Sequence, residues 1–326
     1  MTARTAIIGL GIMGRRMLEH MLRHPGYQPV ALWDPDPLAC QEARALAPDV
    51  RIATSADDAM ADAELVYLAC PPVPRKAYAL AAKRDGKAVF LEKPLGVDVA
   101  ESEALVAAFR ESGVPAAVNF TQAAGAALTG VSEAARTGVL GALQGADIVV
   151  TYADWPRAWQ KAADWLRFRD EGGMTREVIS HFLFFCERIL GPLSVVWARP
   201  SYPADPRLCE THMLARLETA EGLPVTIMAS VGGAQPDRQE LTIKGARASR
   251  RITDFHVDAL SDGGPFEELA ERPSDPRAVS LKAQLDDLLL CMRGAPNRLA
   301  TLDEALRVQK LVETMLRGTN GSGQAA

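Results

Sequence analysis

The chain has 326 residues and a formal net charge of −5 at pH 7, with 48% hydrophobic and 24% charged residues. This length and composition predict a globular protein of two domains, and the negative charge argues against nucleic-acid and anionic-membrane partners. Five cysteines stand singly, which argues against a disulfide framework and a zinc site. No run reaches membrane-spanning length and no secretory leader fits before the first predicted strand, so we expect a cytoplasmic protein. From the charge and the scattered cysteines we expect a small-molecule substrate and no bound metal.

The first part of the chain alternates apolar runs with helical patterns. Its predicted strands are residues 7–9, 30–33, 65–69, 88–91 and 115–120. Helical stretches separate these strands, such as residues 99–110, which Gly113 ends. The alternation is typical of an α/β fold with a doubly wound parallel sheet, so we predict a Rossmann domain over residues 1–122.

The pattern changes after Phe120. The expected helices are residues 126–136, 174–190, 279–292 and 302–316, and the expected strands are residues 146–152, 212–219, 224–231, 240–244 and 249–253. Short polar or glycine-bearing turns join the last four strands, as in antiparallel sheets. We therefore predict an α+β domain with an open, mainly antiparallel sheet over residues 123–326, ending in a frayed tail at residues 318–323.

A glycine-rich turn follows the first predicted strand and precedes the first helix. Gly9 permits the sharp turn, Gly11 lets the backbone approach a pyrophosphate, and Gly14 lets helix and strand pack closely. The helix start, including Ile12 and Met13, offers free N–H groups and the positive end of a dipole. This pattern predicts a dinucleotide site, although an ordinary glycine turn in a βα unit has the same local features.

Asp34 ends the second predicted strand, twenty positions after Gly14. This spacing suits a carboxylate that binds the adenosine ribose hydroxyls, while the alternative role is a helix cap. No arginine or lysine follows closely, and Asp36 adds a second negative charge where a 2′-phosphate would sit. The sequence therefore favours NAD over NADP as the cofactor.

Two later strands also end in residues that suit a ligand site. Cys70, Pro71 and Pro72 follow one strand, and the prolines predict a loop along the nicotinamide ribose. Glu92 and Lys93 end the next strand, at the sheet edge where such folds bind ligands. Read alone, a lysine beside a proline at a strand end has a structural role more often than not.

The helix predicted from residue 174 follows two glycines and carries Glu177 and His181 four positions apart, on one face. Such a pair can share protons with a substrate, or it can be an ordinary helix contact. The preceding stretch, residues 154–169, is rich in tryptophan and arginine, which suit a sugar ring and a carboxylate. Its alternative role is an aromatic core with solvated arginines.

In this order, the glycine turn, strand-end acid, proline pair, Glu-Lys-Pro and Gly-Gly helix resemble the Gfo/Idh/MocA family of nicotinamide-dependent oxidoreductases. The resemblance implies an active site between the two domains, a cis Lys93-Pro94 peptide, and a homodimer or homotetramer formed through the C-terminal sheet. It implies that Lys93, His181 and Glu177 are catalytic. The implied cofactor contacts are Gly9, Gly11, Ile12, Met13, Gly14, Asp34, Cys70, Pro71, Pro72, Glu92 and Lys93, and the implied substrate contacts are Lys93, Asn119, Trp165, Arg176, Glu177 and His181.

Three positions depart from the family pattern. Glu177 stands where an aspartate is usual, Arg75 replaces a histidine, and Gln122 replaces an arginine. The leading hypothesis is an NAD-dependent dehydrogenase of a sugar, polyol or related cyclic hydroxy compound. An imine reductase or dihydrodiol dehydrogenase fits the same scaffold. A non-catalytic NAD sensor or scaffold is the third hypothesis, against which the presence of both Lys93 and His181 argues.

Overall fold

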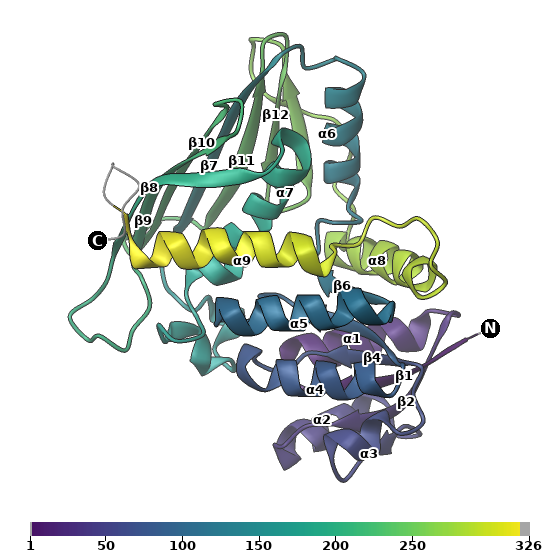
Figure 1. Ribbon diagram of the computed structural model, residues 1–326. Coiled ribbons are helices and arrows are strands. Elements are labelled where there is room, and N and C mark those ends of the chain that lie inside the picture. Colours follow the sequence, from purple (N-terminus) through teal and green to yellow (C-terminus); the bar gives the residue numbers. More distant parts are fainter. Residues whose placement is uncertain (1, 320–326) are drawn as a thin grey trace. The chain divides into compact units, whose positions relative to one another are not determined.

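The computed structural model describes residues 2–319, which divide into two compact units (Figure 1). The first unit runs up to Ala123 and includes Arg277–Leu306. The second comprises Ala124–Pro276 and the chain from Arg307 onward. The units thus meet in the chain one residue from the predicted domain boundary, and they differ from the predicted domains in the segment from Arg277 to Leu306.

The sheet of the first unit is fully parallel. Its strands are β1 (Ala3–Ile8), β2 (Tyr27–Trp33), β3 (Arg51–Ile52), β4 (Leu65–Leu68), β5 (Ala88–Glu92) and β6 (Ala116–Asn119). They lie in the order β3-β2-β1-β4-β5-β6. This order reverses direction between β1 and β4, so the predicted doubly wound sheet is confirmed and its ligand edge lies at the carboxyl ends of these strands. The two-residue β3 was not predicted because it is too short to show a pattern.

Six helices belong mainly to this unit: α1 (Ile12–Arg23), α2 (Pro37–Leu46), α3 (Ala56–Met60), α4 (Pro72–Arg84), α5 (Val99–Ser112) and α8 (Pro276–Met292). Asp36, Ser55 and Asp98 cap α2, α3 and α5, each by accepting a backbone N–H in the first turn. Helix α8 belongs here because its buried leucines join the core of the parallel sheet. The Tyr27 hydroxyl also donates to the Leu285 carbonyl at 2.6 Å.

The sheet of the second unit has eight strands, and all neighbours are antiparallel except β7 and β10. The order is β14-β13-β12-β11-β7-β10-β9-β8. The bounds are β7 (Leu143–Tyr152), β8 (Leu193–Ser201), β9 (His212–Thr219), β10 (Pro224–Val231), β11 (Arg238–Gly245), β12 (Ser249–Thr253), β13 (Val257–Ser261) and β14 (Glu267–Glu268). The predicted mainly antiparallel sheet is confirmed, although β8, β13 and β14 were not predicted.

One face of this sheet is buried. Along β7, β9 and β10 every second side chain is inaccessible, as the strand period of two requires. Helix α7 (Ser180–Leu190) packs on β7, and α6 (Ala126–Arg136) packs against α7 (Figure 1). Helix α9 (Leu302–Arg317) begins in the first unit and continues in the second.

The predicted tail is partly ordered. Thr319 donates its N–H to the Ala198 carbonyl of β8, and its hydroxyl accepts the Ala198 N–H, both at 2.9 Å. Residues 320–323 of the predicted tail lie outside the described residues. Among residues 2–319, every helix is too short or too polar to cross a membrane.

Candidate functional site

The glycine turn after β1 has the geometry that a dinucleotide site needs. Gly9 has a φ of +93°, and a Cβ there would lie 2.6 Å from the Ala69 carbonyl carbon at the end of β4. A Cβ on Gly14 would overlap the Gly9 carbonyl oxygen. A Cβ on Gly11, in contrast, meets no atom within 4 Å. The turn is therefore closed on the protein side and open at its central glycine, where a phosphate can approach the backbone.

Helix α1 begins at this turn without a side-chain cap. Gly11 occupies the cap position and offers no acceptor to the first N–H groups, those of Ile12, Met13 and Gly14. Arg15 has already turned into the helix, because its N–H bonds to the Gly11 carbonyl at 3.1 Å. An uncapped helix start beside an open backbone turn is an anion site by its dipole and its N–H groups.

The Asp34 carboxylate lies at the same turn. One of its oxygens accepts the Leu10 N–H at 2.6 Å, and the other accepts the Asp36 N–H at 2.8 Å. The helix cap is instead Asp36, which accepts the Leu38 N–H at 2.9 Å. The carboxylate is thus fixed in orientation, and each of its oxygens keeps a lone pair for a ribose hydroxyl.

The proline pair after β4 forms a helix start rather than the predicted loop. Pro71 caps α4 and Pro72 opens it, because the fixed φ of proline suits the first helical turn and its missing N–H needs no partner there. Cys70, just before them, is buried, and burial raises the pKa of its thiol. The three residues keep their predicted place at the carboxyl edge of β4.

Arg75 on α4 binds the backbone of this edge. Its guanidinium is buried and donates to the carbonyls of Cys70 and Glu92, each at 2.6 Å, and to that of Pro94. These carbonyls end β4 and flank Lys93 on both sides. The peptide between Lys93 and Pro94 is cis, as predicted, and the Lys93 side chain is half-buried. Arg75 therefore fixes the backbone that presents Lys93.

Glu92 faces the interior of the first unit. Its carboxylate accepts hydrogen bonds from the Tyr67 hydroxyl and, at 2.6 Å, from the Asn119 amide. Burial raises the pKa of Glu92, although these two donors and the Lys93 charge act against that rise. This bond joins the Asn119 amide to Glu92, so both buried residues stabilise the carboxyl edge of β5 and β6 from inside the first unit.

The helix that carries Glu177 and His181 starts differently from the prediction. Residues Thr175–Ile179 form a π turn, and α7 begins only at Ser180. The Ser180 N–H reaches back to the Thr175 carbonyl, and its hydroxyl donates to the Arg176 carbonyl at 2.6 Å. The wider turn follows from these bonds, and such turns are frequent at functional sites.

The two glycines before this turn have structural causes. A Cβ on Gly172 would lie 2.5 Å from the Leu166 carbonyl carbon. Gly173 has a φ of +103°, and a Cβ there would lie 2.9 Å from a carboxylate oxygen of Glu210. The buried Glu210 accepts the Thr175 N–H at 2.7 Å, and burial raises its pKa. The glycines thus make room for protein groups that hold the turn.

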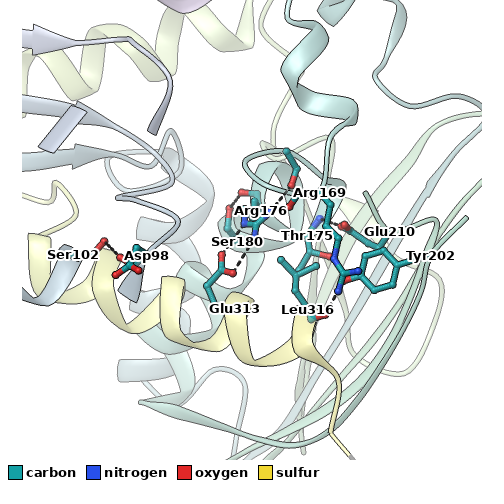
Figure 2. A network of polar contacts seen from close by, with 11 residues as sticks. Asp98, Ser102, Arg169, Thr175, Arg176, Ser180, Tyr202, Glu210, Glu313 and Leu316 are labelled. Atoms are coloured by element: carbon teal, nitrogen blue, oxygen red, sulfur yellow. Dashed lines mark hydrogen bonds and ion pairs between the residues drawn. The ribbon is translucent and has the colours of Figure 1, made fainter. Parts of the chain in front are cut away.

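Arg176, predicted to contact substrate, belongs to the interior of the second unit. Figure 2 shows its guanidinium paired with both carboxylate oxygens of Glu313 on α9, at 2.7 and 2.9 Å. It also donates to the carbonyls of Arg169 and Gly172. Burial alone would lower the pKa of Arg176, but the Glu313 carboxylate, together with Glu210 and Tyr202, acts against burial, and the pKa is raised. We assign Arg176 to the support of the π turn because these partners occupy its donors.

His181 is buried on the first turn of α7. The edge of its ring meets Phe255, with ring centroids 5.4 Å apart and planes at 71°, and Phe255 stacks in parallel on Phe182. Phe255 and Asp254 form the turn between β12 and β13 with φ values of +69° and +52°. Such values are unfavourable for a bulky residue, so the turn holds the Phe255 ring against His181 at a cost.

The stretch before the π turn gathers aromatic rings around one cation. Trp165 lies half-buried in a 3-10 turn, Asp164–Arg167. Arg157 lies over the rings of Tyr152, Trp155 and Trp159. The stretch thus forms one aromatic cluster around Arg157. Only some of its arginines are exposed to solvent.

Known proteins identify the first unit. The model of a family described as an oxidoreductase family with an NAD-binding Rossmann fold, GFO_IDH_MocA, matches residues 3–120. The matched residues, which make up less than half of the chain, are therefore similar to the NAD-binding domain of the Gfo/Idh/MocA oxidoreductase family. The predicted resemblance is confirmed.

Two curated relatives match part of the Gfo/Idh/MocA domain. One, from Amycolatopsis mediterranei, is provisionally named the oxidoreductase subunit of UDP-kanosamine synthase, and is 35% identical over 116 residues, or 35% of this chain and 32% of that protein. The other, inositol 2-dehydrogenase from Rhodococcus erythropolis, is 35% identical over 108 residues, or 32% of this chain and 31% of that protein. Each match spans about a third of the relative's length.

A solved structure resembles nearly the whole chain. The WlbA dehydrogenase from Bordetella pertussis, solved with NADH and UDP-GlcNAcA, has a TM-score of 0.81 and 23% identity, with 97% of this chain and 95% of that chain covered. The likeness shows that the second unit, too, has the fold found in this relative.

The structural roles of Arg75 and Phe255 were not predicted from the sequence. Arg75 had a usable signal, since it lies on the buried stripe of α4 with Pro72, Ala79 and Ala82, and a cation on such a stripe must find partners. Phe255 had a weaker one, because only Asp254, and no glycine or asparagine, marks a left-handed conformation in its turn. Among residues 2–319, no group of three or more His, Cys, Asp or Glu side chains could hold a metal ion.

Proposed function

We propose that this protein is an NAD-dependent dehydrogenase that interconverts a secondary alcohol and a ketone on a sugar, polyol or related cyclic hydroxy compound. One observation carries the proposal. The Asp34 carboxylate is hydrogen-bonded to the backbone of a glycine turn that is open at Gly11 and leads into an uncapped helix. In a dinucleotide site the carboxylate binds the adenosine ribose and the open turn with its uncapped helix binds the pyrophosphate, so the two features must lie close together.

The residues at the turn fit the dinucleotide. Gly11, Ile12, Met13 and Gly14 would receive the pyrophosphate, with Gly9 shaping the turn. The charges favour NAD: Asp34 and Asp36 are anionic, and the nearby Arg15 is paired with Glu42 at 2.7 Å and bonded to the Leu10 carbonyl. Cys70, Pro71 and Pro72 line the next strand end, toward the nicotinamide side.

The proposed chemistry divides between a lysine and a histidine. When bound, NAD supplies the hydride acceptor. In the oxidative direction the substrate hydroxyl gives its proton to the His181 imidazole while its carbon loses a hydride, which leaves a ketone. The Lys93 ammonium would hydrogen-bond the reacting oxygen and stabilise its developing negative charge. Glu177 would bind a further hydroxyl, and Trp165 would offer a face to the sugar ring.

The substrate class rests on the curated relatives. One is named for inositol and the other for a UDP-sugar, so both are named for polyhydroxylated rings. We propose a substrate of this class for the present chain. The choice within the class, and between NAD and NADP, is the first question for experiment.

A coupled assay tests the proposal. Purified protein is screened by nicotinamide absorbance with sugars, polyols, sugar acids and UDP-sugars in the presence of NAD or NADP, and with cyclic imines in the presence of NADH or NADPH. Lys93→Met and His181→Asn should each lower turnover at least about a hundredfold while NADH still binds. Lys83→Met and His212→Asn are matched controls. Turnover of imines alone would favour an imine reductase, and full activity of both site variants would refute the proposed roles.

The sheet of the second unit supports the predicted homo-oligomer. Leu214 on β9 and Met228 on β10 are cross-strand partners on the open face, and their side chains are 46% and 40% exposed. Adjacent exposed apolar side chains on a sheet are suited to burial in an interface. We propose a dimer or tetramer through this face, to be measured by light scattering of wild type and Met228→Glu. The cytoplasmic location stays a prediction.

A further inference from the structure

A cluster of rings encloses one guanidinium in the second unit. The Arg157 Cζ lies 4.8 Å from the ring centroid of Trp159, 5.2 Å from that of Tyr152 and 5.8 Å from that of Trp155. The Arg157 residue is half-buried. Aromatic faces attract the cation and exclude water from it, so its charge acts in a medium of lower dielectric than the solvent.

The guanidinium is also fixed in orientation. Its Nε donates to the Gln160 side-chain oxygen at 2.8 Å, and the Gln160 N–H bonds to the Arg157 carbonyl at 2.8 Å. The buried Gln160 amide in turn donates to a Glu177 oxygen at 3.3 Å. Arg157 is therefore tied through one amide to the π turn that leads to His181.

The outer end of the guanidinium is left for a ligand. Among residues 2–319, neither Nη1 nor Nη2 of Arg157 forms a hydrogen bond or an ion pair with a carboxylate. Arg167, in contrast, is paired with Asp164 at 3.1 Å. A fixed fork of donors with its Nε already satisfied is the geometry that binds carboxylate or phosphate oxygens.

A second group at the same place lacks a partner. The Tyr152 hydroxyl is fully buried, and it makes no hydrogen bond within the described part of the chain. Burial raises its pKa, while the Arg157 charge acts in the opposite direction, so the hydroxyl stays a neutral donor at pH 7. A buried donor without an acceptor costs free energy that a ligand oxygen can recover.

We propose that Arg157, with the Tyr152 hydroxyl beside it, binds an anionic group on the substrate, either a ring carboxylate or a nucleotide diphosphate. This inference rests on the proposed dehydrogenase function and narrows its substrate class to acidic sugars or sugar nucleotides. Gln160 is the positioning residue, because it holds the guanidinium and the Glu177 carboxylate through opposite ends of one amide.

Binding is measured first, since it does not require turnover. Calorimetric titrations of the NADH-loaded protein use D-glucose, D-glucuronate, UDP-glucose and UDP-glucuronate. Wild type should bind at least one anionic ligand tenfold or more tightly than D-glucose. Arg157→Gln should lose that preference, and Arg157→Lys should keep part of it, because lysine retains the charge but not the fork. Arg167→Gln is the matched control and should behave as wild type.

The four ligands distinguish a carboxylate site from a diphosphate site, and turnover distinguishes the anion site from the proposed dehydrogenase function. A loss for D-glucuronate and UDP-glucuronate but not for UDP-glucose assigns the carboxylate, and a loss for both UDP-sugars but not for D-glucuronate assigns the diphosphate. In turnover, Arg157→Gln should raise KM for the anionic substrate at least tenfold with little change in kcat. Arg157-dependent anion binding without any nicotinamide reduction would refute the dehydrogenase and keep the anion site. Equal binding of neutral and anionic sugars by wild type, or an unchanged preference in folded Arg157→Gln and Arg157→Lys, would overturn the inference.

Discussion

Replacing Asp34 by asparagine tests the cofactor site without any knowledge of the substrate. The amide oxygen can still accept the Leu10 N–H, which the carboxylate now accepts at 2.6 Å, so the glycine turn should keep its shape. What is lost is the negative charge, one acceptor for the ribose hydroxyls and the acceptor of the Asp36 N–H. A charge-assisted hydrogen bond contributes about 1.5–3 kcal/mol, so the Kd for NADH should rise by about tenfold to 150-fold.

The same substitution should act in the opposite direction on NADPH. Two charges 4 Å apart repel by about 1 kcal/mol in water and more in a partly buried site, so removing the carboxylate should tighten NADPH binding about fivefold or more. Fluorescence titration with NADH and NADPH measures both constants. Asp62→Asn removes the same charge at an exposed position and serves as the control. If both constants for Asp34→Asn stay within twofold of wild type, Asp34 does not bind the ribose and the reasoning fails.

Three further substitutions test the supports of the two half-sites. Arg75→Gln leaves buried carbonyls unpaired, so urea denaturation should show a loss of about 3 kcal/mol or more; an unchanged midpoint would contradict the backbone clamp. Glu313→Gln leaves the buried Arg176 charge uncompensated and should cost about 3–5 kcal/mol, whereas the double variant Arg176→Met/Glu313→Leu should recover most of it. Glu92→Gln tests the raised pKa of Glu92, because ionising this buried carboxyl lowers the stability of the folded state. The free energy of unfolding of wild type, relative to this variant, should fall as pH rises from 4.5 toward the raised pKa. A difference that does not change with pH would refute the raised pKa.

The first unit could be predicted because its signals are local. The run before Gly9 and the strand end at Lys93 each occupy a few consecutive residues, and Asp34 follows Gly14 by twenty positions within one βαβ unit. Parallel βαβ units place such strand ends at one edge of the sheet. The loop predicted after β4 was wrong because two prolines were interpreted only as a strand end. Proline also opens helices, and Pro72 does so here.

The second unit resisted prediction where distant segments meet. Nothing near Arg176 in the sequence shows that Glu313, 137 positions later, neutralises it. The π turn follows from the same kind of contact, since Glu210 takes the Thr175 N–H from another part of the chain. The spacing of apolar residues predicts a helix, but it does not predict which backbone N–H groups will donate to a carboxylate from a distant part of the chain.

One departure from the family pattern is connected to the aromatic cluster in the structure. The sequence has Glu177 where an aspartate is usual, and it has an arginine at position 157 in the aromatic stretch. The extra methylene of glutamate extends the carboxylate toward Gln160, which it meets at 3.3 Å, and Gln160 holds Arg157 at 2.8 Å. An aspartate would be too short to keep this contact with the same backbone, so the longer side chain links the acid of the π turn to the cation of the aromatic cluster. The longer acid therefore helps to hold Gln160, the residue that orients the guanidinium of the proposed anion site.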